Sequence, residues 1–317
     1  MLICVGLGFA SGLPLFLLVQ LVPAWLRLEG VSLTAIGFFT AIQYPYSLKF
    51  LWSPAVERYS VPWLGRRRGW MLLTQVLLIL SISVLGVWQP ADALLAVTLI
   101  AILIAVFSAT QDIVIDAYRR ELLVTDGELA LGNTVHVQAY RLAGLIPGSL
   151  GMILAGFMPW EWVFPIMAAF MGFGIVLTLS IREAQSDPVT PGSLKAAITE
   201  PFREFFARRG YRAALAVLAF MFLYKLGDNM ATALATPFYI DMGFTTTQIG
   251  LIAKNAALWP SIIGGVLGGI IIVKIGINRG LWVFGVVQLM TIFGFVWLSE
   301  VGAVPWVLVM VIGAEYL

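Results

Sequence analysis

The sequence predicts an all-α protein that crosses a membrane many times. Of its 317 residues, 60% are hydrophobic and 11% are charged, and the mean hydropathy is +0.95, so polar residues are too few to cover a soluble globule of this size. The apolar residues form runs of roughly 20, the length that a helix needs to cross a bilayer. Cations concentrate in every second connector between these runs, as in helical membrane proteins of fixed orientation.

The apolar runs divide the chain into roughly ten expected spans, which cover residues 2–26, 34–57, 70–89, 93–118, 131–157, 161–181, 211–240, 247–274, 280–299 and 303–317. The first run lacks the charged start of a signal peptide, so we expect it to be a spanning helix. The last run reaches Leu317 after only about 15 residues without a polar flank. We therefore expect the chain to end inside a helix.

The positive charges between spans predict the orientation. Fifteen of the nineteen lysines and arginines lie there, and fourteen of the fifteen fall in alternate connectors. These fourteen are Arg58, Arg66, Arg67, Arg68, Arg119, Arg120, Arg182, Lys195, Arg203, Arg208, Arg209, Arg212, Lys274 and Arg279. The other connectors contain only Arg27. Because basic residues near helix ends resist translocation, we expect the basic connectors and the amino terminus to be cytoplasmic.

A change of composition divides the chain into two groups of spans. Residues 182–210 contain helix breakers such as Pro188 and Pro191, followed by an amphipathic stretch with Ile198, Phe202, Phe205 and Phe206 on one side. We expect a cytoplasmic linker that lies on the membrane face. It would separate an amino-terminal six-helix bundle, residues 1–181, from an incomplete carboxy-terminal bundle of four helices, residues 211–317.

A short repeat crosses this linker. Residues 30–37 match residues 243–250 at four of eight positions, with an offset of 213 residues. At the same offset Arg66 falls on Arg279, so an extracellular turn and a basic turn both recur. Six helices, a linker and a second copy in the same orientation describe the parallel two-half architecture of the major facilitator superfamily.

Several other classes of protein are disfavoured by composition. The net charge is only +2 and the cations are spread over four connectors, so the pI of about 8.7 gives no support for nucleic-acid binding. Cys4 and His136 are each the sole residue of their type, which leaves no internal disulfide and no multi-histidine or thiolate metal site. We expect neither a cofactor nor enzyme activity, because the basic connectors hold no nucleophile with a base at useful spacing.

Charged residues inside the spans are the candidates for function. They are Lys49, Asp112, Asp116, Arg141, Lys225, Asp228, Lys254 and Glu315. Each costs about 2.5–3.5 kcal/mol near the bilayer centre. A load of this size predicts ion pairing and a hydrated cavity.

The spacing of these charges predicts two groupings. Asp112 and Asp116 are four residues apart, on one helix face with Ser108, and could line a polar path. Lys225 and Asp228 are three apart and could form a pair that a proton or an anionic substrate breaks.

Structural roles are open for several of the same residues. Asp116 lies beside Arg119 and Arg120, where an ion pair could simply hold helix ends together. Lys49 could extend to the membrane surface or pair with an aspartate of the first half, and His136 could be a polar packing residue.

Several stretches together resemble the bacterial muropeptide permease family of AmpG type, a branch of the major facilitator superfamily. They are residues 8–14 (GFASGLP), 49–54 (KFLWSP) with Arg58-Tyr59, 65–70 (GRRRGW), 108–118 (SATQDIVIDAY), 140–142 (YRL) and 223–228 (LYKLGD). They occur in family order over nearly the whole chain. Glu57 stands where the family usually has aspartate, which keeps the charge, and the family has at least twelve spans.

The resemblance implies import, from periplasm to cytoplasm across the bacterial inner membrane, of N-acetylglucosamine linked to anhydro-N-acetylmuramic acid, often with a peptide. In that family uptake depends on the proton motive force. The expected partners are this substrate, protons and the lipid bilayer, with the protein monomeric and without nucleic acid.

The site residues expected on this basis fall into three groups. Proton coupling would involve Asp112, Asp116, Asp228 and Glu315. Substrate binding would involve Lys49, Arg141, Lys225, Lys254, Gln43, Tyr46, Gln111 and Asn229. A cytoplasmic gate loop would contain Glu57, Arg58, Arg66, Arg67, Arg68 and Arg279.

Three other functions remain open from the sequence. A related branch carries acetyl-coenzyme A, the aspartates could serve a membrane-embedded enzyme as acid and base, and the protein could be a sensor or assembly platform that transports nothing.

Overall fold

The computed structural model describes residues 1–61, 64–183, 203–208 and 210–317, without the side chains of residues 126, 130, 225–233, 254, 266, 269, 273 and 277. Every regular element in these ranges is helical, which confirms the predicted fold class. The central part of the expected linker and the first part of its amphipathic stretch lie outside the described residues.

The first span is continuous but changes its hydrogen bonding in the middle. It consists of α1 (Leu2–Phe16), the π turn η1 (Leu17–Leu21) and α2 (Val22–Leu28). Pro14 lies inside α1 and removes one N–H donor from the helical ladder, and the π turn follows three residues later.

The second expected span, residues 34–57, is not one regular helix. It is built from α3 (Leu33–Phe39), η2 (Thr40–Gln43), α4 (Tyr44–Leu48), η3 (Lys49–Leu51) and α5 (Ser53–Arg58). Pro45 and Pro54 each stand in the first turn of a new segment, because proline cannot continue the preceding hydrogen-bond ladder. The prediction of a single helix was wrong here, and the break places Lys49 on a short 3-10 turn.

The next four spans are close to their expected positions. They are α6 (Arg66–Leu85), α7 (Pro90–Leu122), the pair α8 (Asp126–Ala143) and α9 (Met152–Ala155) joined by η4 (Ile146–Gly151), and α10 (Trp160–Ser180). Helix α8 begins five residues before the expected start, because Thr125 and Glu128 form a capping box that satisfies its first N–H groups.

The remaining helices are α12 (Tyr211–Asp241), α13 (Thr246–Gln248), η5 (Ile249–Ala253), α14 (Lys254–Ile275), α15 (Ile277–Val301) and α16 (Pro305–Tyr316). The repeat seen in the sequence has the same local structure in both copies. Gly30 and Gly243 both have positive φ, 85° and 93°, and the Ser32 and Thr245 side chains then cap α3 and α13.

Six helical stretches of the described chain are long and apolar enough to cross a membrane. They are Leu2–Leu28, Arg66–Leu85, Pro90–Leu122, Trp160–Ser180, Thr246–Ile272 and Asn278–Val301. Tyr211–Tyr224 and Pro305–Tyr316 are shorter apolar helices. Large apolar side chains such as Leu95, Trp282 and Trp306 are exposed along these helices, as expected for a surface in contact with lipid.

The helices before residue 181 pack closely with one another, and so do α14, α15 and α16. Glycines allow the tightest of these contacts: a Cβ at Gly8 or Gly12 of α1 would overlap the carbonyl oxygens of His136 and Tyr140 on α8. This close approach fixes the part of α8 around His136 and Tyr140 against α1.

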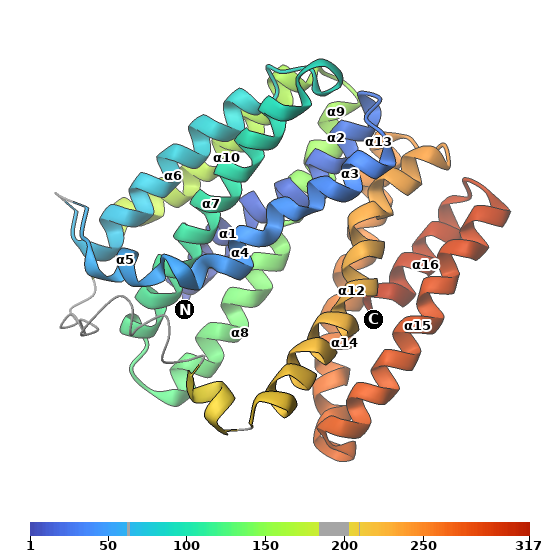
Figure 1. Cartoon of the computed structure of the whole chain (residues 1–317). Helices are drawn as coiled ribbons and strands as arrows, with labels where there is room; N and C mark the ends of the chain where they lie inside the picture. The colour runs from blue at the N-terminus through green and yellow to red at the C-terminus, as the bar shows by residue number, and fades with distance from the viewer. Residues whose placement is uncertain (62–63, 184–202, 209) are drawn as a thin grey trace.

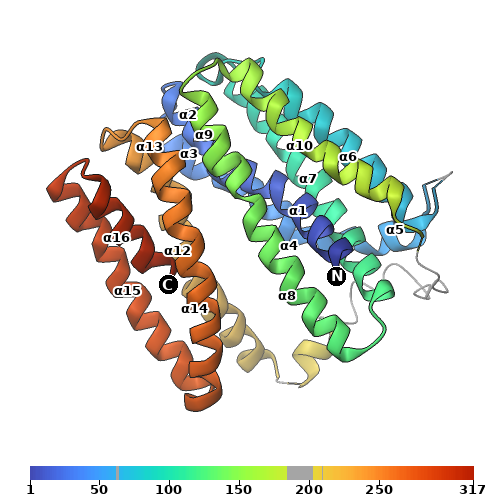
Figure 2. The same ribbon diagram turned by 180° about the vertical axis from the view of Figure 1, so that it is seen from behind.

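The two groups of helices meet mainly at one end of the molecule (Figures 1 and 2). There α2 and α3 pack against α12, α9 packs against α13, and η4 packs against η5. An ion pair of 2.6 Å between Arg27 Nε and Asp241 Oδ1 lies at the same end. The main contact between the groups thus lies toward the end of the spans that is predicted to be extracellular.

Candidate functional site

The charges expected inside the first half come together around Asp112 on α7. Lys49 Nζ lies 3.9 Å from Asp112 Oδ2 and 3.9 Å from Asp116 Oδ2. Ser11 on α1 donates a hydrogen bond of 2.5 Å to the other carboxylate oxygen of Asp112. Asp112 is therefore held by a hydroxyl on one side and attracted by a distant cation on the other, since 3.9 Å is too long for a hydrogen bond.

Asp116 occupies the next turn of α7 and is more exposed than Asp112, with 44% against 13% of its side chain accessible. Its Oδ1 lies 3.0 Å from Arg119 Nη2, so the helix-end ion pair that the sequence left open is present. Lys49 pairs with both aspartates, which was one of the two alternatives for this lysine. The four side chains form a charge cluster with no net charge, two cations and two anions.

Arg141 on α8 joins the two groups of helices. Its Nη1 donates a hydrogen bond of 2.8 Å to the carbonyl oxygen of Ser261 on α14. In the described part of the chain, no carboxylate lies within ion-pair distance of Arg141. Among the described side chains, therefore, no acid neutralises the charge of Arg141, which could serve an anionic ligand.

Two cavities meet at Arg141. One, of about 320 Å³, lies between the groups and is lined by Gln20, Arg141, Thr236, Tyr239, Ser261 and Tyr316 among others. The second, of about 530 Å³, lies between α1, α7 and α8 and contains Asp112, Asp116, Arg119, Asn133, His136, Tyr140 and Arg141. Phe16 and Arg141 line both cavities, so the charge cluster and the space between the groups are neighbours.

The uncharged residues expected to bind substrate lie in different environments. Tyr46 lies near Asp112 and Ser108, with its hydroxyl group buried. Gln111 is fully buried and donates 3.2 Å to the carbonyl of Ala10, which joins α7 to α1. Gln43 is exposed on η2. The structure thus brings Tyr46 to the charge cluster and leaves Gln43 and Gln111 away from the two cavities.

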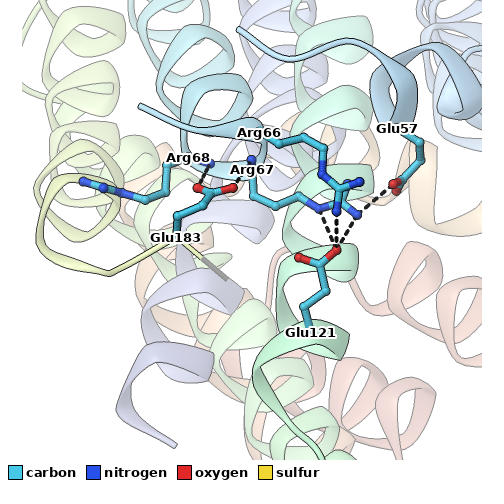
Figure 3. Close-up of polar contacts among 6 residues, drawn as sticks. All are labelled: Glu57, Arg66, Arg67, Arg68, Glu121 and Glu183. Atoms are coloured by element: carbon cyan, nitrogen blue, oxygen red, sulfur yellow. Dashed lines mark hydrogen bonds and ion pairs between the residues drawn. The ribbon is translucent and has the colours of Figure 1, made fainter. Parts of the chain in front are cut away.

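A second charge cluster lies at the cytoplasmic end predicted for α6 (Figure 3). Arg67 is only 5% exposed, and its Nη2 lies 2.7 Å from Glu57 Oε2 and 2.7 Å from Glu121 Oε1. Arg66 Nη2 also lies 2.9 Å from Glu121 Oε1. These contacts join α5, α6 and the end of α7, and we call this set of residues, with Glu183, the end cluster.

Glu183 completes the end cluster from the residues that follow α10 (Figure 3). Its carboxylate accepts hydrogen bonds from the backbone N–H groups of Arg67 and Arg68, at 2.7 and 3.1 Å. This cap explains why α6 begins at Arg66 and not at the expected residue 70. The Arg68 guanidinium also donates to the Thr178 and Leu179 carbonyls at the end of α10.

The other expected residues are only partly placed. Arg58 and Arg279 are exposed, on α5 and α15. The side chains of Lys225, Asp228, Asn229 and Lys254 lie outside the described residues. Glu315 lies on α16 next to Tyr316, which lines the smaller cavity.

Sequence reasoning missed Ser11, Glu121, Glu183 and Ser261. Glu121 follows the Arg119-Arg120 pair and could have been included as a helix-end charge, but no local pattern marks the other three as partners of distant residues. Among the residues that the structure describes, no three His, Cys, Asp or Glu side chains are placed to hold a metal ion.

Comparisons with known proteins indicate a membrane transporter. Residues 4–315 match the family model of the Major Facilitator Superfamily. An uncharacterized protein of Haemophilus influenzae is 50% identical, with 100% of this chain and 76% of that protein aligned. The anhydromuropeptide permease of Escherichia coli K12 is 39% identical over 89% of this chain and 57% of the permease. The chain thus spans little more than half the length of that permease.

A third relative and two solved structures extend the comparison. The putative transporter AmpG 4 of Rickettsia felis is 31% identical, over 93% of this chain and 72% of that protein. The nucleoside transporter NupG (D323A mutant) superposes with a TM-score of 0.69 and a D-xylose–proton symporter with 0.66, each at 14% identity. Each covers 99% of this chain, with 79% and 78% of the solved chains aligned, and the likeness shows the fold.

Proposed function

Since the chain belongs to the major facilitator superfamily, and within it to the AmpG-type permeases, we propose that this transporter imports anhydro-muropeptides from the periplasm to the cytoplasm, driven by the proton motive force. The substrates would be N-acetylglucosamine linked to anhydro-N-acetylmuramic acid, with or without a peptide. The protein would reside in the bacterial inner membrane as a monomer, with its amino terminus in the cytoplasm.

The observation that carries this proposal is the charge cluster beside the larger cavity. A carboxylate that is mostly enclosed in a membrane protein, with a hydroxyl donor at 2.5 Å and a cation at 3.9 Å, can gain or lose a proton without unfolding its surroundings. Protonation of Asp112 would remove its attraction for Lys49. Lys49 could then turn to Asp116, or to an anionic group in the cavity.

Arg141 supports an anionic substrate. It lines both cavities and has no carboxylate within ion-pair distance in the described part. Guanidinium groups bind carboxylates with paired, charge-assisted hydrogen bonds. The lactyl carboxylate of the muramic acid, or a carboxylate of the peptide, is the expected partner. Lys225, Lys254 and Asn229 would complete this site from the second half, and Asp228 and Glu315 would take part in proton coupling.

Transport would proceed by rocking of residues 1–181 against residues 211–317 around the two cavities. The groups touch mainly at the end of the Arg27–Asp241 ion pair, which is predicted to face the periplasm. The described conformation would therefore have access from the cytoplasm. The opposite form requires that this ion pair separates and that the end cluster approaches the second half, where Arg279 lies.

Uptake into proteoliposomes tests the proposal. Purified protein is reconstituted, and accumulation of radiolabelled anhydro-disaccharide peptide is measured with and without an imposed pH gradient, acid outside. We expect accumulation only with the gradient, and its loss in Asp112→Asn. Accumulation that ignores the gradient, or uptake of acetyl-coenzyme A in place of the sugar, would refute the proposed function.

A further inference from the structure

The larger cavity has a second polar wall that the proton and carboxylate sites do not use. Arg119 from α7 and His136 from α8 both line it. Each has a buried nitrogen without a hydrogen-bond partner: Nη1 of Arg119 and Nδ1 of His136. Buried polar atoms are normally satisfied, so two unpartnered nitrogens on residues that line one cavity mark a place where a ligand group could satisfy both.

The Arg119 guanidinium group is held by Asp116, and its Nη1 is a hydrogen-bond donor without a partner. Only 12% of its side chain is exposed, and Nη2 is engaged by Asp116 at 3.0 Å. The partner of Nη2 fixes the planar guanidinium group, so the direction of Nη1 is also set. A ligand group that meets Nη1 must be a hydrogen-bond acceptor.

The imidazole of His136 is also held in place, but its unpartnered nitrogen is a hydrogen-bond acceptor. It is 7% exposed, lies in the tight α1–α8 contact at Gly8, and makes a hydrogen bond to the backbone of Cys4. When one ring nitrogen of a neutral imidazole donates to a backbone carbonyl, the other nitrogen is an acceptor. The ligand group that meets Nδ1 must therefore be a donor.

The charges around Arg119 and His136 favour a neutral ligand group at these two residues. Arg119 and Lys49 are already matched by Asp112 and Asp116. A further carboxylate here would meet two anions as well as two cations, whereas at Arg141 it would meet a cation that has no acid partner among the described side chains. The anion therefore belongs at Arg141, and a neutral group that both accepts and donates belongs at Arg119 and His136.

We propose that Arg119 and His136 form a subsite for an acetamido group, in which Arg119 donates to the carbonyl oxygen and His136 Nδ1 accepts the N–H. This inference rests on the proposed function, because the acetamido group is that of the anhydro-N-acetylmuramic acid. In that sugar the acetamido and lactyl groups stand on neighbouring ring carbons. His136 and Arg141 are five residues apart on α8, about 7.5 Å along its axis, and both line the larger cavity, so we expect one sugar to reach both.

Binding of two ligands to the intact protein in nanodiscs tests the subsite. The first is radiolabelled anhydro-disaccharide without peptide, whose amides are the acetamido groups alone. The second is the analogue with acetoxy in place of the acetamido group of the anhydro-muramic residue, which keeps the carbonyl and loses the N–H. One hydrogen bond of about 1–1.5 kcal/mol corresponds to roughly tenfold in affinity, so we expect the analogue to bind about tenfold more weakly. Equal affinity of the two ligands for the wild type overturns the inference and requires no variant.

Two substitutions of His136 distinguish ligand recognition from packing. His136→Asn keeps an acceptor near the δ position, whereas His136→Gln keeps a polar group near the ε position, which faces Cys4. We expect discrimination against the analogue to persist in His136→Asn and to vanish in His136→Gln. The reverse order would show that the histidine only anchors α8 to α1, and would refute the subsite.

Arg119→Lys and the matched control Arg120→Lys, one residue away and exposed, test the other half. Lys keeps the charge opposite Asp116 but loses the second terminal nitrogen, so we expect weaker binding of both ligands, by about tenfold, and none in Arg120→Lys. Equal effects in the two variants would contradict the role of Arg119. If the wild type binds neither ligand, the proposed function itself fails, which is a different outcome from binding without discrimination.

Discussion

The two charge clusters of this protein contain the same kinds of residues and are built differently. In the end cluster the Arg67 guanidinium is almost fully buried and lies 2.7 Å from two glutamates, with a third glutamate on the neighbouring backbone N–H groups. In the cluster at Asp112 the lysine stays 3.9 Å from both aspartates. A cavity of about 440 Å³ is lined by residues of both clusters, Lys49 and Asp116 with Glu57, Arg67 and Glu121. Short contacts between buried groups hold helices together, whereas contacts of 3.9 Å leave charges that can exchange partners.

The function of each cluster follows from this difference. A buried pair with one member removed leaves an uncompensated charge, which makes the end cluster costly to disrupt. Proton coupling needs the reverse, a carboxylate whose partner can leave. Substitutions in each cluster therefore test this difference, because those in the end cluster should reduce stability and those at Asp112 should reduce transport.

The largest effect on stability is expected at Arg67. Arg67→Met removes the cation shared by Glu57 and Glu121 and should cost about 3–5 kcal/mol of unfolding free energy. Thermal unfolding in detergent, followed by circular dichroism, measures the loss. The control is Arg58→Met, at an exposed arginine nearby, which should change little. Equal losses in the two variants would show that the end cluster is no more rigid than the surface.

Asp112→Asn should change stability little and abolish gradient-driven transport. The amide keeps the shape and can still accept from Ser11, and Lys49 keeps Asp116, so the loss of stability should stay below about 1.5 kcal/mol. Gradient-driven accumulation should disappear, while exchange of substrate across the membrane without a gradient should persist. A large drop in melting temperature would place Asp112 with the structural charges and remove the distinction between the clusters.

Arg141 sharpens the comparison, as a cation that belongs to neither cluster. Arg141→Gln should weaken binding of the anhydro-disaccharide by about tenfold or more, the size of one charge-assisted hydrogen bond. An analogue with the lactyl carboxylate reduced to an alcohol should bind both proteins alike. Discrimination between these ligands that survives in Arg141→Gln would assign the carboxylate to another residue.

The smallest effect concerns an exposed charge at the start of α8. Hydrogen bonds from Thr125 lower the pKa of Glu128 below its ordinary value of 4.5. A lowered pKa in the folded state stabilises the protein above pH 4.5, and the contribution is lost as the pH falls through the folded value. We expect Glu128→Gln to flatten the melting temperature slightly between pH 6 and pH 3. A curve unchanged from wild type would mean that the cap adds nothing measurable.

Much of the fold could be predicted because the signals are local. Apolar length located most of the spans, and the recurring Gly30 and Gly243 turns marked equivalent places. The second span was wrong in detail because Pro45 and Pro54 interrupt a run that its apolar length alone marks as one helix. The early start of α6 could not be predicted, because its cap comes from Glu183, more than a hundred residues away.

The sequence predicted several charged residues of the candidate site, but it did not predict which residues contact one another. The cost of charge in lipid singles out Lys49, Asp112, Asp116 and Arg141 from the sequence alone, and three of the four form one cluster. Ser11 and Ser261 carry no such penalty, so nothing in their neighbourhoods indicated a partner. The sequence suggests a packing role for His136, and its unpartnered nitrogen is evident only beside the cavity.

The sequence by itself determined that the protein lies in a membrane, where its spans begin and end within a few residues, and which charges lie inside. These properties depend on residues that are neighbours in the sequence, so they do not require knowledge of the tertiary structure. The tertiary structure alone decided which charges lie in short, buried ion pairs and which lie in longer ones. That depends on distances between α1, α7, α8 and α14, set by helix packing, and no run of neighbouring residues encodes them.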